Sequence, residues 1–240
     1  FKMKKVFHPA STRGSSDFGW LKANYSFSFA NYFNPNRLQF GALRVLNDDF
    51  IDGGMGFGTH PHQNMEIITI PLAGALQHKD SMGNEGIIHE GEVQVMSAGS
   101  GVQHSEFNGS KTEMANTLQI WVFTETENVE PRYDQKKYTP EDRHNKLLTV
   151  VSPKDDNDGN ALWVHQQTYF NLGNIDAGKK VNYQVHRENH GMYIFLISGK
   201  VKIDDQTLEK RDALGIWEAN GTEIEVLEDA RILLIEVPME

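Results

Sequence analysis

The 240-residue chain contains no cysteine, which excludes disulfides, thiolate catalysis and zinc sites built on cysteine. Positive charge is also scarce, because 23 Lys and Arg face 33 Asp and Glu and leave a formal net charge of −10. Nucleic acid and anionic membrane surfaces attract cationic patches, so we expect neither as a direct partner. No run approaches the about 20 apolar residues of a membrane span, and no signal-peptide core is visible. These absences favour a cytoplasmic protein.

Helical periodicity is nearly absent as well, and the apolar segments are short. Six of them are rich in Val, Ile, Phe and Tyr and are bounded by Gly, Pro, Asn and Asp, as strands joined by tight turns are. They cover residues 65–74, 91–99, 117–125, 147–152, 192–203 and 230–238. Many short strands with Gly-rich turns predict an all-β sandwich or barrel.

The two halves of the chain share a loose pattern in which a His-containing strand leads into a Gly turn. HPHQNMEIITIPLAG begins at residue 60, and HRENHGMYIFLISG begins at residue 186. We therefore predict two tandem β-barrels. Residues 1–130 form the first barrel, 131–146 are a polar connector, and 147–240 form the second barrel.

Two pairs of metal-ligating residue types stand at strand spacing in the first half. His60 and His62 are two residues apart, and so are His104 and Glu106. Residues i and i+2 of a strand project from the same face, so neighbouring strands would bring all four side chains together. Three imidazoles and one carboxylate suit Fe(II), Ni, Mn, Zn or Cu and not Ca or Mg. On a six-coordinate ion, two positions stay open for substrate, water or dioxygen.

A second carboxylate competes with Glu106 for the fourth ligand position. Glu66 follows His62 by four residues and would therefore point to the same face of a continuous strand. Along a straight strand, however, it would lie about 13 Å from His62. Glu106 is therefore the easier ligand, and Glu66 is expected in a supporting or structural role.

The remaining histidines are less suggestive. We expect His78 and His89, in the segment between the two motifs, at the rim or in solvent. His186 and His190 are four residues apart, but no later His-x-Glu follows them, so we expect no metal in the second barrel. Several other side chains either line the pocket or belong to the core: Met55, Phe57, Met96, Asn108, Gln119 and Trp121.

These motifs resemble those of the cupin superfamily. The first runs from Gly54 through His60-x-His62 and Glu66 to a Gly turn, and the second runs from Gly91 through His104 to Asn108. Two departures from the common cupin pattern are informative. Seven residues rather than six separate Glu66 from Gly74, and a serine stands at position 97 where many cupins have proline. Both departures, with the strings THPHQNMEI, MSAGSGVQHSE and LQIWV, resemble pirin, a bicupin subfamily.

The resemblance implies two facing barrels with a single metal in the first. It implies His60, His62, His104 and Glu106 as the ligands and favours Fe(II), with Ni, Mn, Zn or Cu as alternatives. It also suggests quercetin 2,3-dioxygenase activity, with a flavonol and O2 as substrates. Within such a mechanism we expect Glu106 to loosen from the metal and act as the catalytic base. Other pirins act as redox-sensitive protein partners in transcription, so a metal-dependent binding protein is the alternative. Cupins also include isomerases and decarboxylases, since fold alone does not fix function. We expect a monomer.

Overall fold

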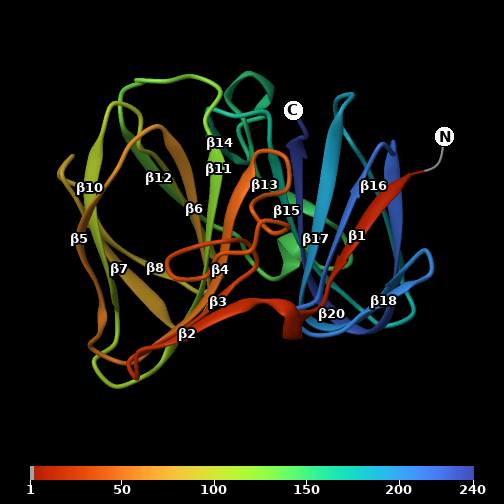
Figure 1. Ribbon diagram of the computed structural model, residues 1–240, viewed down its shortest axis with the longest axis horizontal. Helices are drawn as coiled ribbons and strands as arrows, with labels where there is room; N and C mark the ends of the chain where they lie inside the picture. The colour runs from red at the N-terminus through yellow and green to blue at the C-terminus, as the bar shows by residue number, and fades with distance from the viewer. Residues whose placement is uncertain (1–2) are drawn as a thin grey trace.

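The computed structural model describes residues 3–240, which fold into two β-barrels lying side by side (Figure 1). The predicted all-β class is confirmed, and each of the six apolar segments contains a strand. Helical structure in the described part is limited to three short 3-10 turns, η1 (Ala10–Thr12), η2 (Glu141–Arg143) and η3 (Lys154–Asp156). No helix within residues 3–240 is long and apolar enough to cross a membrane.

Two antiparallel sheets form the first barrel. The larger one follows the order β12 (Arg132–Lys137), β9 (Glu92–Ser97), β6 (Met65–Ala73), β11 (Ala115–Phe123), β4 (Leu43–Ile51), β3 (Leu21–Tyr25) and β2 (Gly14–Asp17). The smaller one follows the order β5 (Gly56–His62), β10 (Val102–Asn108), β7 (Ala75–Asp80) and β8 (Glu85–His89). Figure 1 shows the smaller sheet at the outer side of the molecule, with β6, β11 and β4 toward the second barrel.

One curled sheet forms the second barrel. Its main path follows the order β1 (Lys4–His8), β19 (Ala213–Trp217), β17 (His190–Ile203), β20 (Gly221–Pro238), β15 (Tyr169–Ile175), β13 (Leu148–Pro153) and β14 (Leu162–Val164). In addition, β16 (Lys180–Gln184) pairs with β20, and β18 (Gln206–Leu208) pairs with β17. The pairing of β17 with β20 contains several register shifts, which let these two long strands bend around the barrel.

The two barrels share a hydrophobic core. Leu118 and Ile120 of β11 belong to the same buried cluster as Leu233 and Ile235 of β20. The larger sheet of the first barrel is thus covered on both faces, by its own barrel interior and by the second barrel. This double coverage explains why residues 65–73 read as an almost continuous apolar run rather than an alternating one.

Two segments do not belong to the parts of the chain to which the predicted domain boundaries assigned them. Strand β1 pairs with β19 of the second barrel, from Lys4 opposite Trp217 to His8 opposite Ala213, although residues 1–130 were assigned to the first barrel. Strand β12 extends the first barrel by pairing with β9, although it falls in the predicted connector. Both assignments are wrong because local patterns do not report pairing between distant strands. Residues 1–2 of the predicted first barrel lie outside the described residues.

Glu66 lies between the two barrels. It stands opposite Ser97 on β9, and Glu66 Oε1 accepts hydrogen bonds from Ser97 Oγ at 2.7 Å and from the backbone N–H of His165 at 2.6 Å. Glu66 Oε2 is buried without a partner among the described residues. Burial raises the pKa of Glu66 despite these hydrogen bonds. Its role is therefore structural, and it links the first barrel to the loop that follows β14.

Two substitutions at this position are expected to differ in their cost. Glu66→Ala leaves the Ser97 hydroxyl and the His165 N–H without an acceptor, so it should lower the free energy of unfolding by about 3 kcal/mol. Glu66→Gln keeps that acceptor and removes a desolvated charge, so we expect a loss of about 1 kcal/mol or less. Thermal unfolding of both variants measures the difference, and equal losses would show that the charge itself is required.

Candidate metal centre

The four predicted ligands come from two neighbouring strands of the smaller sheet. His60 and His62 lie on β5, His104 and Glu106 lie on β10, and His104 stands directly opposite His60. A register shift between His104 and Glu106 leaves Glu106 opposite Phe57. Alternate residues on both strands therefore project into the barrel, as strand geometry requires.

The structure brings the three imidazoles into one cluster. Their candidate ligand atoms all lie within 4.8 Å of one another, and the ring centroids of His60 and His104 are 4.4 Å apart. His62 Nε2 and His104 Nε2 face each other at 2.9 Å. Two nitrogens bound side by side to one ion at about 2.1 Å would be about 3 Å apart. The spacing thus fits a transition metal held by Nε2 atoms.

A backbone contact orients His60 for the same role. His60 Nδ1 lies 2.7 Å from the carbonyl oxygen of Gly58, so Nδ1 carries the proton and donates it. The Nε2 lone pair of His60 is then free to face the cluster. Metal-ligating histidines are commonly oriented in this way, with the other ring nitrogen bonded to an acceptor.

Burial keeps two of the imidazoles neutral. It lowers the pKa of His62 to about 4, with a further contribution from the neighbouring His60. It lowers the pKa of His104 to about 3, helped by the imidazoles of His60 and His62. Neutral imidazole is the form that binds a metal, so at pH 7 these side chains are ready as ligands.

Glu106 lies beside the imidazole cluster. Its Oε1 is 3.6 Å from His104 Nε2, and its Oε2 accepts a hydrogen bond of 2.5 Å from Gln119 Nε2. Burial raises the pKa of Glu106 to about 7, although the Gln119 hydrogen bond opposes that rise. A buried carboxylate is costly without a cation, so the donor set of three imidazoles and Glu106 fits a divalent ion.

A cavity of about 90 Å³ opens beside these residues. His60, His62 and Glu106 line one side of it, and the rest is lined by aromatic and aliphatic groups with three polar side chains, Asn47, Asp49 and Gln119. The wall includes Leu21, Ala23, Tyr25, Phe29, Phe57 and Trp121. The Trp121 ring packs edge-on against His62, with centroids 5.1 Å apart. The chamber next to the imidazoles is therefore suited to a flat apolar group.

The predicted lining residues divide between cavity and core. Phe57, Gln119 and Trp121 line the cavity. Asn108 does not, because its Nδ2 donates to the carbonyl oxygens of Ile51 and Glu113. Met55 is partly exposed, and Met96 belongs to a buried apolar cluster.

The opposite wall of the cavity consists of residues that no sequence motif identifies. Tyr25, Phe29, Asn47 and Asp49 reach it from β3, β4 and the segment between them. Asp49 is a buried carboxyl whose pKa is raised to about 8 by desolvation and by the nearby charges of Asp48 and Glu106. No motif marks these residues, although two consecutive aspartates within an apolar strand were an available signal.

The placement of His78 in a rim loop was wrong. His78 lies on β7 with no exposed surface, and its Nε2 is 2.7 Å from Asp80 Oδ2. Its ring centroid is 5.4 Å from that of His104, so it packs directly behind a candidate ligand. His89, on β8, is exposed as expected.

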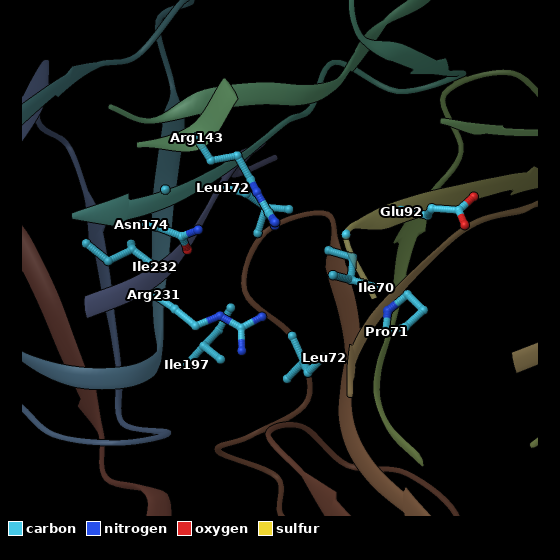
Figure 2. Close-up of a pocket in the computed structure, with 12 residues that line it drawn as sticks. Ile70, Pro71, Leu72, Glu92, Arg143, Leu172, Asn174, Ile197, Arg231 and Ile232 are labelled. Atoms are coloured by element: carbon cyan, nitrogen blue, oxygen red, sulfur yellow. The ribbon is translucent and has the colours of Figure 1, made fainter. Parts of the chain in front are cut away.

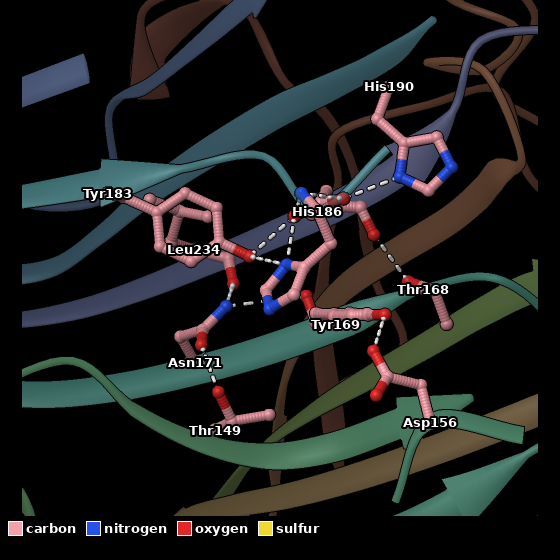
Figure 3. A network of polar contacts seen from close by, with 10 residues as sticks. Thr149, Asp156, Thr168, Tyr169, Asn171, Tyr183, His186, His190 and Leu234 are labelled. Atoms are coloured by element: carbon pink, nitrogen blue, oxygen red, sulfur yellow. Dashed lines mark hydrogen bonds and ion pairs between the residues drawn. The ribbon is translucent and has the colours of Figure 1, made fainter. Parts of the chain in front are cut away.

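His186 and His190 of the second barrel belong to one polar network (Figure 3). The group that both of them contact is Glu236 of β20. His186 Nδ1 and His190 Nδ1 lie 2.8 and 2.5 Å from its two carboxylate oxygens. Tyr183 Oη and the backbone N–H of His186 also donate to it. Burial favours protonation of Glu236, but these hydrogen bonds outweigh burial and lower its pKa. The carboxylate is thus ionised and saturated with donors.

Comparison with known proteins finds a matching family for each half of the chain. A family described as Pirin matches residues 6–122, and one described as Quercetinase C-terminal cupin domain matches residues 149–237. The chain is 40% identical over 229 residues to a quercetin 2,3-dioxygenase of Escherichia coli, covering 95% of this chain and 96% of that one. It is 38% identical over 228 residues to a pirin-like protein of Caulobacter vibrioides, covering 95% and 97%. A crystal structure of the bacterial pirin YhhW of Escherichia coli in complex with nickel(II) superimposes with a TM-score of 0.92 at 38% identity, covering 98% and 99%.

Proposed function

The chain belongs to the pirin family, and we propose that it is a metal-dependent dioxygenase that cleaves flavonols such as quercetin with O2. The observation that carries this proposal is the position of Glu106, a buried carboxylate between three convergent imidazoles and an aromatic-walled cavity. A relative that is aligned over 96% of its length is named for this activity, which supports the choice of substrate class.

We propose that His60, His62, His104 and Glu106 hold one divalent transition metal ion. Fe(II) is our first choice, and Ni, Mn, Zn or Cu also suit the donor set. The nickel(II) complex of a relative supports a transition metal at this centre and leaves iron as a proposal. When bound, the metal supplies the Lewis acidity and the redox chemistry that a reaction with O2 requires.

Glu106 is the proposed proton acceptor. A flavonol would enter with the edge that carries its 3-hydroxyl and 4-carbonyl groups, and Glu106 would take the hydroxyl proton. Burial raises the pKa of Glu106 to about 7 when no cation is present. A bound divalent ion would lower it and so keep Glu106 in the carboxylate form that accepts a proton. Gln119 donates to Oε2, so Oε1, which lies beside His104, is the oxygen that would hold the metal. The same oxygen would accept the proton once it is released from the ion.

The apolar wall serves to orient the substrate. Phe29, Phe57 and Trp121 present ring faces and edges against which a flat heterocycle packs. In the proposed reaction both oxygen atoms of O2 enter the product, the central ring opens, and one carbon leaves as carbon monoxide.

The size of the cavity favours a second candidate function. About 90 Å³ is well below the roughly 300 Å³ at the lower end of small-molecule pockets, so a flavonol would be only partly enclosed. A redox-sensitive metal protein that contacts a protein partner needs no large pocket. For either function we propose a cytoplasmic monomer.

Oxygen uptake with quercetin by the metal-loaded protein tests the first proposal. We expect Glu106→Gln to lower kcat by about 100-fold or more, because the isosteric amide cannot accept the proton. Metal content is measured on the same sample, so that loss of the ion and loss of the base are separated.

His89→Gln is the matched control, because this exposed histidine contacts neither the cavity nor the cluster, and it should retain full activity. Unchanged oxygen uptake in Glu106→Gln would remove Glu106 from catalysis. Stoichiometric metal without turnover in the parent protein, whichever of Fe(II), Ni and Mn is loaded, would favour the binding protein.

A further inference from the structure

A second, small cavity lies between the two barrels, on the far side of the larger sheet from the metal centre (Figure 2). Ile70 and Leu72 of β6 form one wall, and Leu172 of β15 and Ile232 of β20 contribute to the other. Asn174 and Glu92 also line this gap, and two arginines enter it. Arg143 comes from the segment that joins the barrels, at the end of η2, and Arg231 comes from β20.

Figure 2 shows the guanidinium groups of Arg143 and Arg231 directed into this gap. Neither forms an ion pair within 4.0 Å with a carboxylate in residues 3–240, whereas Arg13 and Arg211 both contact Asp48. Arg143 Nε is fully buried and has no hydrogen-bond partner among those residues. Burial and repulsion from Arg231 lower the pKa of the Arg143 guanidinium.

The acidic groups nearby form no ion pair with these arginines, although the charges of Glu90 and Asp142 partly offset the repulsion at Arg143. Glu92 lines the cavity, but its Oε1 accepts from the backbone N–H of His89 and its Oε2 accepts from Gln135 Nε2. Figure 2 shows its carboxylate on the side away from the arginines. Asp142 Oδ2 accepts from the backbone N–H of Thr139. In a chain with a net charge of −10, two adjacent arginines without an ion-paired carboxylate among the described residues are an unusual arrangement.

We propose that this cavity is a binding site for a small oxyanion, held jointly by Arg143 and Arg231. Guanidinium groups bind the oxygens of sulfate, phosphate and carboxylate groups through charge-assisted hydrogen bonds. An anion here would neutralise two like charges and give the buried Arg143 Nε an acceptor.

The size of the cavity limits what it takes. Its enclosed part is about 10 Å³, which accommodates roughly one water-sized atom, and the remainder opens to solvent. One oxygen of the anion would therefore be enclosed between the guanidiniums while the rest stays at the surface. The ligand class is an inorganic oxyanion or the carboxylate of a small organic acid, and these share the chemistry that the arginines recognise.

The position of the site gives the ligand a structural consequence. It would contact the joining segment through Arg143 and the second barrel through Arg231, beside β6 of the first barrel. An anion that bridges these parts would stabilise their arrangement, because ligands that bind only the folded state raise its stability.

Isothermal titration calorimetry of the metal-loaded full chain tests the proposal, with sodium sulfate and sodium acetate as separate probes and sodium chloride at equal ionic strength as reference. We expect saturable 1:1 binding of at least one oxyanion, weakened about tenfold or more in Arg143→Met and in Arg231→Met. Lys22→Met removes one positive charge from an exposed position of β3 and should leave binding unchanged.

Arg231→Lys keeps the charge without the planar fork and should retain weaker binding, which guards against a folding defect in the methionine variants. Preference for sulfate would identify an inorganic oxyanion, and preference for acetate a carboxylate. The proposal is overturned by the absence of saturable binding, by binding that the arginine variants do not weaken, or by equal binding of chloride.

Discussion

Replacing His104 by alanine is expected to weaken binding of a divalent transition metal by about 100-fold or more. His104 is the most buried of the three clustered imidazoles, and its Nε2 lies 2.9 Å from that of His62. Its loss removes one ligand of the proposed set. Loss of a residue that only supports a ligand already costs 10- to 100-fold in affinity, so loss of a ligand should cost at least as much.

Titration with Ni(II), followed by calorimetry, measures this effect on the whole chain. The matched control is His89→Ala, which removes an exposed imidazole from the same sheet and should bind Ni(II) like the parent protein. Thermal unfolding without metal shows whether His104→Ala still folds. A folded His104→Ala variant with unchanged Ni(II) affinity would show that the ion binds elsewhere.

The clustering of the three imidazoles could be predicted because it needs only two facts about strands. Alternate residues share a face, and β5 and β10 pair so that His104 stands opposite His60. The first fact is local and can be read from the spacing. The second was an assumption at the level of the sequence, and it agrees with the observed register.

The alternation of side chains between the two faces of a strand does not continue across the turn between β5 and β6. The prediction counted Glu66 on the same face as His62, but β5 ends at His62, and Asn64 has a φ of 49° before β6 begins. The turn resets the side-chain direction, so Glu66 faces the second barrel. His78 was misplaced for a different reason. The inner face of its strand, ALQHKD, carries the apolar Leu76 followed by the polar His78 and Asp80, so no run of alternating apolar residues revealed it.

Local sequence patterns could not predict the opposite wall of the cavity or the strand with which β1 pairs. Tyr25 and Asp49 approach the imidazoles only because β3 and β4 continue the larger sheet beyond β11. Likewise, β1 pairs with β19 at the other end of the sequence. Such neighbours are selected by tertiary packing, which a single sequence does not display.

Glu236→Ala is expected to destabilise the second barrel more than any surface substitution. It removes a fully buried carboxylate that accepts hydrogen bonds from Tyr183, His186 and His190 (Figure 3). Breaking a buried ionic network by removing one partner typically costs 3–5 kcal/mol, so we expect a loss of about 3 kcal/mol or more. For a chain of this size that corresponds to roughly 6–12 °C in Tm.

The same carboxylate should make the protein sensitive to acid. Hydrogen bonds lower the pKa of Glu236 in the folded state below the ordinary value of 4.5, despite its burial. A lowered carboxyl pKa stabilises the fold at pH values above the unfolded pKa, and this stabilisation is lost as the pH falls through the folded pKa. The stability difference between the parent protein and Glu236→Gln should therefore be largest near neutral pH and shrink as the pH falls below about 4.5.

Thermal unfolding of the parent, Glu236→Ala and Glu236→Gln proteins from pH 7 down to pH 3 measures both effects. Glu225→Gln is the control, because it changes an exposed carboxylate on the same strand and should shift neither Tm nor its pH dependence appreciably. We expect Glu236→Gln to lose less stability than Glu236→Ala, since its amide oxygen still accepts a hydrogen bond. A difference between Glu236→Gln and the parent that stayed constant across this pH range would show that Glu236 has the same pKa in the folded and unfolded states. A parent that became relatively more stable as the pH fell would show that Glu236 is protonated in the folded protein. Either result would contradict the ionic network inferred for the second barrel.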